Sequence, residues 1–314
     1  MSESLLQHGT STYQYINSLA AKYGISAKST VGLEAIGPKI LKSLRNQSLI
    51  LVHMASLTFY ISRSKARIAQ GFKCVKMNAT EDVNWVDSPS ILDSCIERLQ
   101  IVKSLGLDAG LDFHGRLHKP MAKQLAKALE PHRPFFIEEP LLSEHPEAIK
   151  QLSGLTTIPI ALGERLYSRW DVKRFLEDRS VDILQPDVSH AGGISETKRI
   201  ATMAEAYDVA IAPHCPLGPI AFAACIQVAL STPNFVIQEM SLGIHYNTDA
   251  GEIDLLTYVK NESVFDIKDG CVAAPTGPGL GIEVDEDMVR RISKETEPWL
   301  PKEFHGPDGS IREW

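Results

Sequence analysis

The sequence predicts an α/β protein built as a (β/α) barrel. Short apolar runs recur through residues 71–240, each ends in polar residues, and helical patterns lie between them. Apolar runs of this kind, without polar alternation, are typical of parallel strands that are covered on both faces. The near-equal repeats favour a barrel over a doubly wound sheet, and no GxGxxG motif follows any run to indicate dinucleotide binding.

Seven strands are expected. In chain order they are FKCVKMN (72–78), DAGLDFH (108–114), PFFIEEP (134–140), IPIALGE (158–164), VDILQPD (181–187), DVAIAPH (208–214) and NFVIQEM (234–240). Helices are expected between them in KPMAKQLAKAL, SETKRIATMAEAYD and GPIAFAACIQVAL. In the first of these, Met121, Leu125 and Leu129 recur every four residues, which places them on one helical face.

Composition narrows the class of partner. The 314 residues are 44% hydrophobic and 23% charged, and the net charge of −7 argues against nucleic-acid binding. The longest apolar stretch, residues 49–61, is too short to span a membrane, and the N-terminus lacks the pattern of a signal peptide. Five scattered cysteines without a CxxC motif favour reduced thiols. We therefore expect a cytoplasmic protein that acts on a small molecule.

Polar residues stand at every predicted strand end, where the chemistry of a (β/α) barrel takes place. In chain order they are Lys76, Asn78, Asp112, His114, Glu138, Glu139, Glu164, Asp187, His214 and Glu239. Any one of them alone is more often a helix cap or a hydrogen-bonded structural residue. One active site, however, explains all seven strand ends together.

Three of the carboxylates are evenly spaced. Asp112, Glu138 and Glu164 follow one another at intervals of 26 residues. Equivalent positions on adjacent strands would place three carboxylates around one point. Oxygen donors with open positions left over suit a hard, octahedral cation, above all Mg²⁺.

Two histidines flank these carboxylates. His114 lies on the same strand face as Asp112, and His214 ends a strand about halfway round the barrel. Asp187, at the end of the preceding strand, can orient His214 and raise its basicity. Opposed imidazoles beside a metal indicate removal of a proton next to a carboxylate, followed by loss of water or by racemisation. Glu239, if protonated, could donate a hydrogen bond to the enolic oxygen.

Glu138 and Glu139 are adjacent but point to opposite sides of their strand. The spacing selects Glu138 as the metal ligand. We expect Glu139 to be a scaffold residue that is paired with a basic residue or a helix N-terminus.

Several long motifs carry a resemblance to a known family. They are GLDFHGRLHKPMAKQLAKALEP, FIEEPLLSE, IPIALGERLYSRWD, ILQPDVSHAGGISETKRIATMAEAYDVAIAPHCPLGPIA and IQEMSLGIHYN. Over roughly residues 65–314 the chain resembles the galactonate dehydratases, in the mandelate racemase branch of the enolase superfamily. The resemblance implies a modified TIM barrel, one Mg²⁺ per subunit, a homo-oligomer and conversion of D-galactonate to 2-dehydro-3-deoxy-D-galactonate.

The resemblance also implies roles for individual residues. The metal ligands would be Asp112, Glu138 and Glu164. Paired with Asp187, His214 would remove the C2 proton, and His114 would assist departure of the C3 hydroxyl. These two histidines could exchange roles if the substrate presented its other face. Glu239 would stabilise the enediolate, although Met240 departs from the family's usual QEQ, and Lys76 and Asn78 would face the substrate.

The front of the chain departs from the family. We expect residues 1–64 to be a divergent segment in place of the α+β capping domain and the first barrel strand. Residues 65–244 would form the barrel and residues 245–314 would complete the cap. Residues 41–61 are the one candidate for a first strand, and without one the barrel has an open edge. Two alternatives stay open: a catalytically silent homologue that binds a metal or a partner, and a related acid-sugar dehydratase or epimerase.

Overall fold

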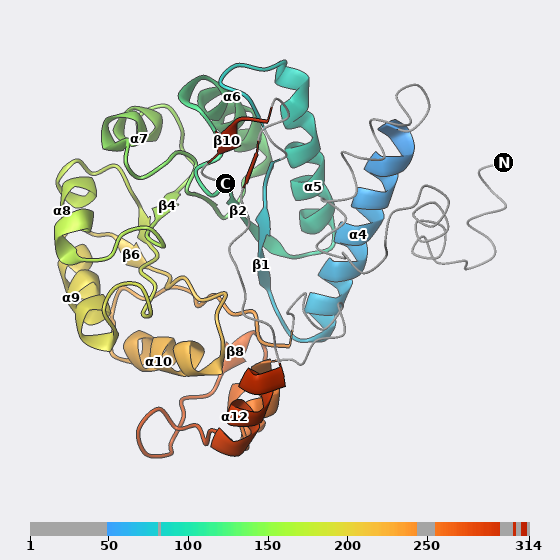
Figure 1. Ribbon diagram of the computed structural model, residues 1–314. Helices are drawn as coiled ribbons and strands as arrows, with labels where there is room; N and C mark the ends of the chain where they lie inside the picture. The colour runs from blue at the N-terminus through green and yellow to red at the C-terminus, as the bar shows by residue number, and fades with distance from the viewer. Residues whose placement is uncertain (1–48, 81–82, 244–254, 296–303, 306–308, 313–314) are drawn as a thin grey trace, which may run out of the picture. The chain divides into compact units, whose positions relative to one another are not determined.

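The computed structural model describes residues 49–80, 83–243, 255–295, 304–305 and 309–312 (Figure 1). The chain divides into two compact units, residues 1–62 with 244–254, and residues 63–243 with 255–314. The sheet, its helices and every predicted site residue belong to the second unit. Among the described residues, no helix is long and apolar enough to cross a membrane.

Six parallel strands form one sheet in chain order. They are β1 (Cys74–Asn78), β2 (Asp108–Asp112), β3 (Phe136–Glu138), β4 (Ile160–Leu162), β5 (Ile183–Leu184) and β6 (Ala210–Ile211). Each lies within a predicted run, and each pairs in parallel with the next. The predicted α/β fold of the barrel type is thereby confirmed. Within the described residues no pairing of β1 with β6 closes the sheet.

The seventh predicted strand, residues 234–240, is reduced to a single parallel bridge between Phe235 and Ile211. Two ladder bonds form there, from Ile211 N–H to Asn234 O at 2.8 Å and from Val236 N–H to Ile211 O at 2.9 Å. The ladder stops because Pro213 has no N–H to donate. The Gln238 side chain instead donates to the carbonyl of Pro213 at 3.0 Å.

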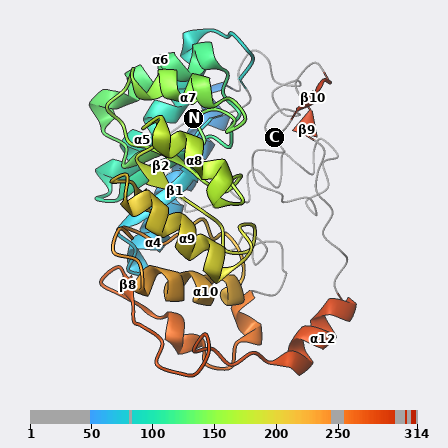
Figure 2. The ribbon, with the colours of Figure 1, turned by 90° about the vertical axis from the view of Figure 1, so that its left-hand side faces the viewer.

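Helices cover the outside of the sheet in chain order. They are α5 (Asp93–Ser104), α6 (Lys119–Leu129), α7 (Pro146–Ser153), α8 (Arg169–Glu177), α9 (Ile194–Glu205) and α10 (Pro219–Leu230). Figure 2 shows α6 to α10 following one another from top to bottom. As predicted, α6 buries Met121, Leu125 and Leu129 against the strands. Short 3-10 helices precede α5 (Pro89–Leu92) and follow α6 (Glu130–His132).

The candidate first strand is wrong for the residues that are described. Helix α4 (Leu49–Ala69) covers residues 49–61 of that segment. Its sequence contains no proline or glycine to break a helix, and the chain turns at Gly71, whose φ of 92° is readily adopted by glycine. Most of the predicted N-terminal segment, residues 1–48, and the boundary at residues 244–254 lie outside the described residues.

The first part of the C-terminal segment, within residues 255–282, packs on α10. The whole segment contains 3-10 helices (Leu255–Tyr258 and Glu262–Phe265), the hairpin β7 (Ile267–Lys268) and β8 (Cys271–Val272), α12 (Glu286–Glu295), and the pair β9 (Phe304–His305) and β10 (Ile311–Arg312). Phe265 meets Phe222 of α10 with ring centroids 5.2 Å apart, in a second apolar core. That these residues complete a capping domain stays a prediction.

Candidate active site

The strand ends converge on the ammonium group of Lys76. Its Nζ lies 2.6 Å from Glu138 Oε1, 2.9 Å from Glu239 Oε1 and 3.1 Å from Asp112 Oδ2. Sheet register explains the convergence, since Asn78 of β1 pairs with Asp112 of β2, and Asp112 pairs with Glu138 of β3. Burial opposes the charge of Lys76, but the three carboxylates outweigh it and hold the pKa of this lysine well above its usual range.

Glu138 is the most enclosed of these carboxylates, at 1% exposure. Its Oε2 accepts a hydrogen bond from Gln185 Nε2 at 2.8 Å. Burial raises the pKa of Glu138 to about 8, with Asp112 and Glu239 adding to the rise and Lys76 opposing it. The uncharged form of the Glu138 carboxyl is therefore favoured in the metal-free protein.

His114 lies at the end of β2 beside Asp112, as the spacing predicts. Its backbone N–H donates to Asp112 Oδ1 at 3.0 Å, and its Nε2 lies 3.3 Å from Asp112 Oδ2. The residue adopts a positive φ of 50°, so the chain turns sharply at this point. Burial lowers the pKa of His114, although Asp112 and Glu164 act in the opposite direction.

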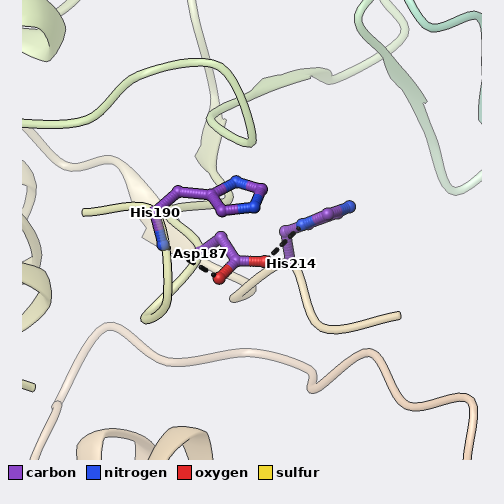
Figure 3. Close-up of side chains that lie close together, drawn as sticks. All are labelled: Asp187, His190 and His214. Atoms are coloured by element: carbon purple, nitrogen blue, oxygen red, sulfur yellow. Dashed lines mark hydrogen bonds and ion pairs between the residues drawn. The ribbon is translucent and has the colours of Figure 1, made fainter. Parts of the chain in front are cut away.

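His214 is held between two carboxylates. Its Nδ1 lies 2.8 Å from Asp187 Oδ2 (Figure 3), and its Nε2 lies 3.0 Å from Glu164 Oε2. Burial opposes protonation, but these two partners together raise the pKa of His214 to about 10. Burial likewise opposes ionisation of Glu164, yet His214 lowers the pKa of this carboxyl to about 2. The predicted pairing of Asp187 with His214 is thus present as a direct contact.

Three residues that the sequence analysis did not predict lie at the site. The Gln185 side chain binds Glu138, the Cys215 N–H donates to Glu239 Oε2 at 2.9 Å, and the ring of His190 lies near that of His214, with centroids 6.1 Å apart. Gln185 stands two residues before Asp187 in an otherwise apolar run, and that position could have identified it. Backbone donors such as that of Cys215 leave no mark on the sequence.

Glu139 differs from expectation in its partner. The residue is fully buried with φ 42°, and its Oε1 accepts the Gly163 N–H at 3.3 Å rather than pairing with a basic side chain or a helix N-terminus. Burial raises the pKa of Glu139 well above its usual range. Gly163 is required here, because a Cβ at this position would lie 2.4 Å from the backbone carbon of Gln185.

Asn78 lies beside this cluster rather than within it. It ends β1, pairs with Asp112 in the sheet register, and is exposed. Its position at the rim leaves a substrate-facing role as a prediction.

The donor atoms suit a divalent metal ion. In the described part of the chain, one ligand atom from each of Asp112, His114 and Glu164 lies within 4.8 Å of the others. Glu138 adjoins this set because it contacts the same ammonium group as Asp112. Carboxylate oxygens are the donors that a hard cation prefers. Two of the three predicted ligands, Asp112 and Glu164, belong to this set, and the third, Glu138, stays a prediction as a ligand.

The sequence of the chain is similar to those of known proteins. A family described as "Enolase C-terminal domain-like" matches residues 61–288. A D-galactonate dehydratase of Ralstonia pickettii (strain 12J) is 49% identical over 257 residues, which cover 81% of this chain and 66% of the relative. One from Variovorax paradoxus (strain S110) is also 49% identical, over 78% of this chain and 64% of that relative. The chain thus spans just under two thirds of the length of these curated relatives.

A solved structure shares the architecture. The crystal structure of a mandelate racemase/muconate lactonizing enzyme-like protein from Rubrobacter xylanophilus DSM 9941 has a TM-score of 0.67 and 27% identity. The match covers 75% of this chain and 61% of that protein.

Proposed function

Because the chain belongs to the enolase C-terminal domain-like family, we propose that it dehydrates a sugar acid, converting D-galactonate to 2-dehydro-3-deoxy-D-galactonate and water. The observation that carries the proposal is the position of His214, which contacts Asp187 at one ring nitrogen and Glu164 at the other. A histidine oriented by a carboxylate, next to a cluster of metal-binding oxygens, is suited to take a proton from carbon.

The metal of this proposal is Mg²⁺, one per subunit, held by Asp112, Glu138 and Glu164. When bound, it would hold the substrate carboxylate and stabilise the negative charge that develops on it. In the structure these ligands contact Lys76, His114 and His214. With the metal held by these carboxylates, Glu164 would no longer need His214 as its partner, and the Nε2 of His214 would be free to receive the proton.

His214 accepts the C2 proton at Nε2, and Asp187 fixes the ring through Nδ1. Loss of the proton gives an enediolate, whose oxygen Glu239, also a partner of Lys76, stabilises by a hydrogen bond in its protonated form. His114 donates a proton to the C3 hydroxyl as the C3–O bond breaks, so that water leaves. The resulting enol takes a proton at C3 and becomes the 2-keto product. Lys76 and Asn78 complete the proposal as substrate-facing groups.

The proposal also includes the cellular location and the oligomeric state of the protein. A homo-oligomer is supported by the resemblance of the chain to the galactonate dehydratases. A cytoplasmic setting is supported by five free cysteines, of which three, Cys95, Cys215 and Cys225, are buried. The proposed partner is a small sugar acid, rather than a nucleic acid or a membrane.

A direct assay tests the proposal. The purified chain is incubated with D-galactonate and Mg²⁺, with and without EDTA, and 2-keto-3-deoxy product is measured. We expect product that EDTA abolishes and added Mg²⁺ restores. His145→Asn, which alters an exposed histidine at the start of α7, is the control and should leave the rate unchanged. A folded protein that binds Mg²⁺ but forms no product would contradict the proposed activity.

A further inference from the structure

We propose that Asp187, His190 and His214 form a second metal site, one that takes a borderline-soft divalent ion such as Zn²⁺. One donor atom from each of the three lies within 4.8 Å of the others. Figure 3 shows the His190 ring above the Asp187 carboxylate and the His214 ring to the right of it. His190 takes no part in the proposed dehydration.

Two of the donors lie close enough together for one ion to contact both. His214 Nδ1 and Asp187 Oδ2 are 2.8 Å apart. Zinc binds histidine nitrogen and carboxylate oxygen at about 2.0–2.2 Å, so one ion can contact both atoms. Asp187 is 1% exposed and is fixed by its other oxygen, which accepts the N–H of Ser189 at 2.7 Å and that of His190 at 3.3 Å. The carboxylate is therefore already oriented.

A hydrogen bond also orients the ring of His190. Its Nδ1 lies 3.1 Å from the carbonyl oxygen of Glu164. A carbonyl only accepts, so Nδ1 carries the hydrogen and Nε2 keeps the lone pair that a metal needs. A histidine that ligates a metal commonly donates its other N–H to a carbonyl or carboxylate in this manner. His190 is exposed, which gives an ion access to the two buried ligands.

The two donor sets select different ions. The first set is dominated by carboxylate oxygens, which suit Mg²⁺. The second offers two imidazoles and one carboxylate, a combination found in zinc sites that keep a position open. Affinity of nitrogen donors for Zn²⁺ is also far higher than for hard ions of the Mg²⁺ type. An ion at the second site would occupy the lone pair and the orienting partner of His214.

Inhibition by Zn²⁺ follows, and this consequence rests on the proposed function. With His214 ligated, the C2 proton has no acceptor. Zinc should then reduce turnover even when the first site is saturated with Mg²⁺. Binding at the three residues does not depend on turnover and can be measured separately.

Calorimetric titration with Zn²⁺ in excess Mg²⁺ tests the site. His190→Gln removes one ligand at an exposed position, and His145→Gln is the matched exposed control. We expect the wild type and the control to show a zinc site that His190→Gln weakens by at least about 10–100-fold, since loss of a group that only supports a ligand already has that effect. In dehydration assays, His190→Gln should resist zinc inhibition by a similar factor.

Equal zinc affinity in the wild type and His190→Gln would overturn the second site, whatever the chain catalyses. Equal weakening in His190→Gln and His145→Gln would also overturn it, because the zinc would then bind the surface at large. Zinc binding lost in His190→Gln from a chain without turnover would support the site while contradicting the proposed dehydration.

Discussion

The ends of β2 and β6 each carry a histidine beside a carboxylate, yet the pKa values of the two histidines move in opposite directions. His114 and His214 both lie largely inside the protein, with side chains 21% and 10% exposed. Burial lowers the pKa of His114, whereas that of His214 rises to about 10. Burial opposes the charged form in both cases.

The number of close carboxylates accounts for the difference. His214 has one at each ring nitrogen, at 2.8 and 3.0 Å. Among the described residues, the carboxylate at a ring nitrogen of His114 is that of Asp112 at 3.3 Å, and Lys76 and Arg116 also lower the pKa of His114. Two residues of one type, at equivalent places in the fold, thus favour opposite protonation states in the metal-free protein because their neighbours differ.

Replacing each histidine in turn should produce the largest effects. His214→Asn should lower exchange of the C2 proton with solvent deuterium by about 10²–10⁴-fold, the usual contribution of a general base. His114→Asn should retain measurable exchange while losing dehydration by a similar factor, because the proton is removed before the hydroxyl leaves. Exchange is followed by NMR, and product formation is assayed in parallel. Equal loss of exchange in both variants would show that the assigned roles are wrong.

The stability of the metal-free protein should depend on pH through the same contrast. Because the pKa of His214 is raised from 6.5, its contribution is complete below pH 6.5 and is lost as pH rises toward 10. Because the pKa of Glu164 is lowered from 4.5, its contribution is complete above pH 4.5 and is lost as pH falls toward 2. The pair therefore stabilises the fold most between about pH 4.5 and 6.5.

His214→Asn should accordingly destabilise the protein most in that window, by about 3–5 kcal/mol, since one partner of a buried pair is left alone. Urea unfolding at a series of pH values measures the effect. His114 provides the contrast. Its pKa is lowered, so the wild type loses stability as pH falls below 6.5, and His114→Asn should reduce that loss. Parallel pH profiles for the two variants would contradict the contrast.

A smaller effect is expected at Gln185, whose amide donates to Glu138. Gln185→Leu keeps a similar volume but removes the donor, and should weaken Mg²⁺ binding by about 10–100-fold through loss of an orienting group. Calorimetric titration measures the affinity. Gln151→Leu, at an exposed position on α7, is the control and should bind Mg²⁺ as the wild type does. Unchanged affinity in Gln185→Leu would show that Glu138 is positioned without it.

The fold and the main site were accessible from the sequence because both depend on periodic patterns. Apolar runs ending in polar residues predicted the strands, and parallel strands bring their carboxyl ends to one edge of the sheet. The spacing of Asp112 and Glu138 accordingly corresponds to direct register partners. The order of Asp187 and His214 on neighbouring strands likewise became a contact of 2.8 Å.

The apolar and polar pattern of the sequence did not predict the individual contacts in the site, because these depend on where side chains and backbone atoms lie in three dimensions. The sequence places Lys76 at a strand end, but it does not show that three carboxylates from different segments contact its ammonium group. Gly163 supplies the partner of Glu139, and His190 gains its tautomer from the carbonyl of Glu164. A residue's charge state follows from the atoms within a few ångströms of it. Those atoms belong to residues that are distant in the sequence, so only the tertiary structure determines which of them are neighbours.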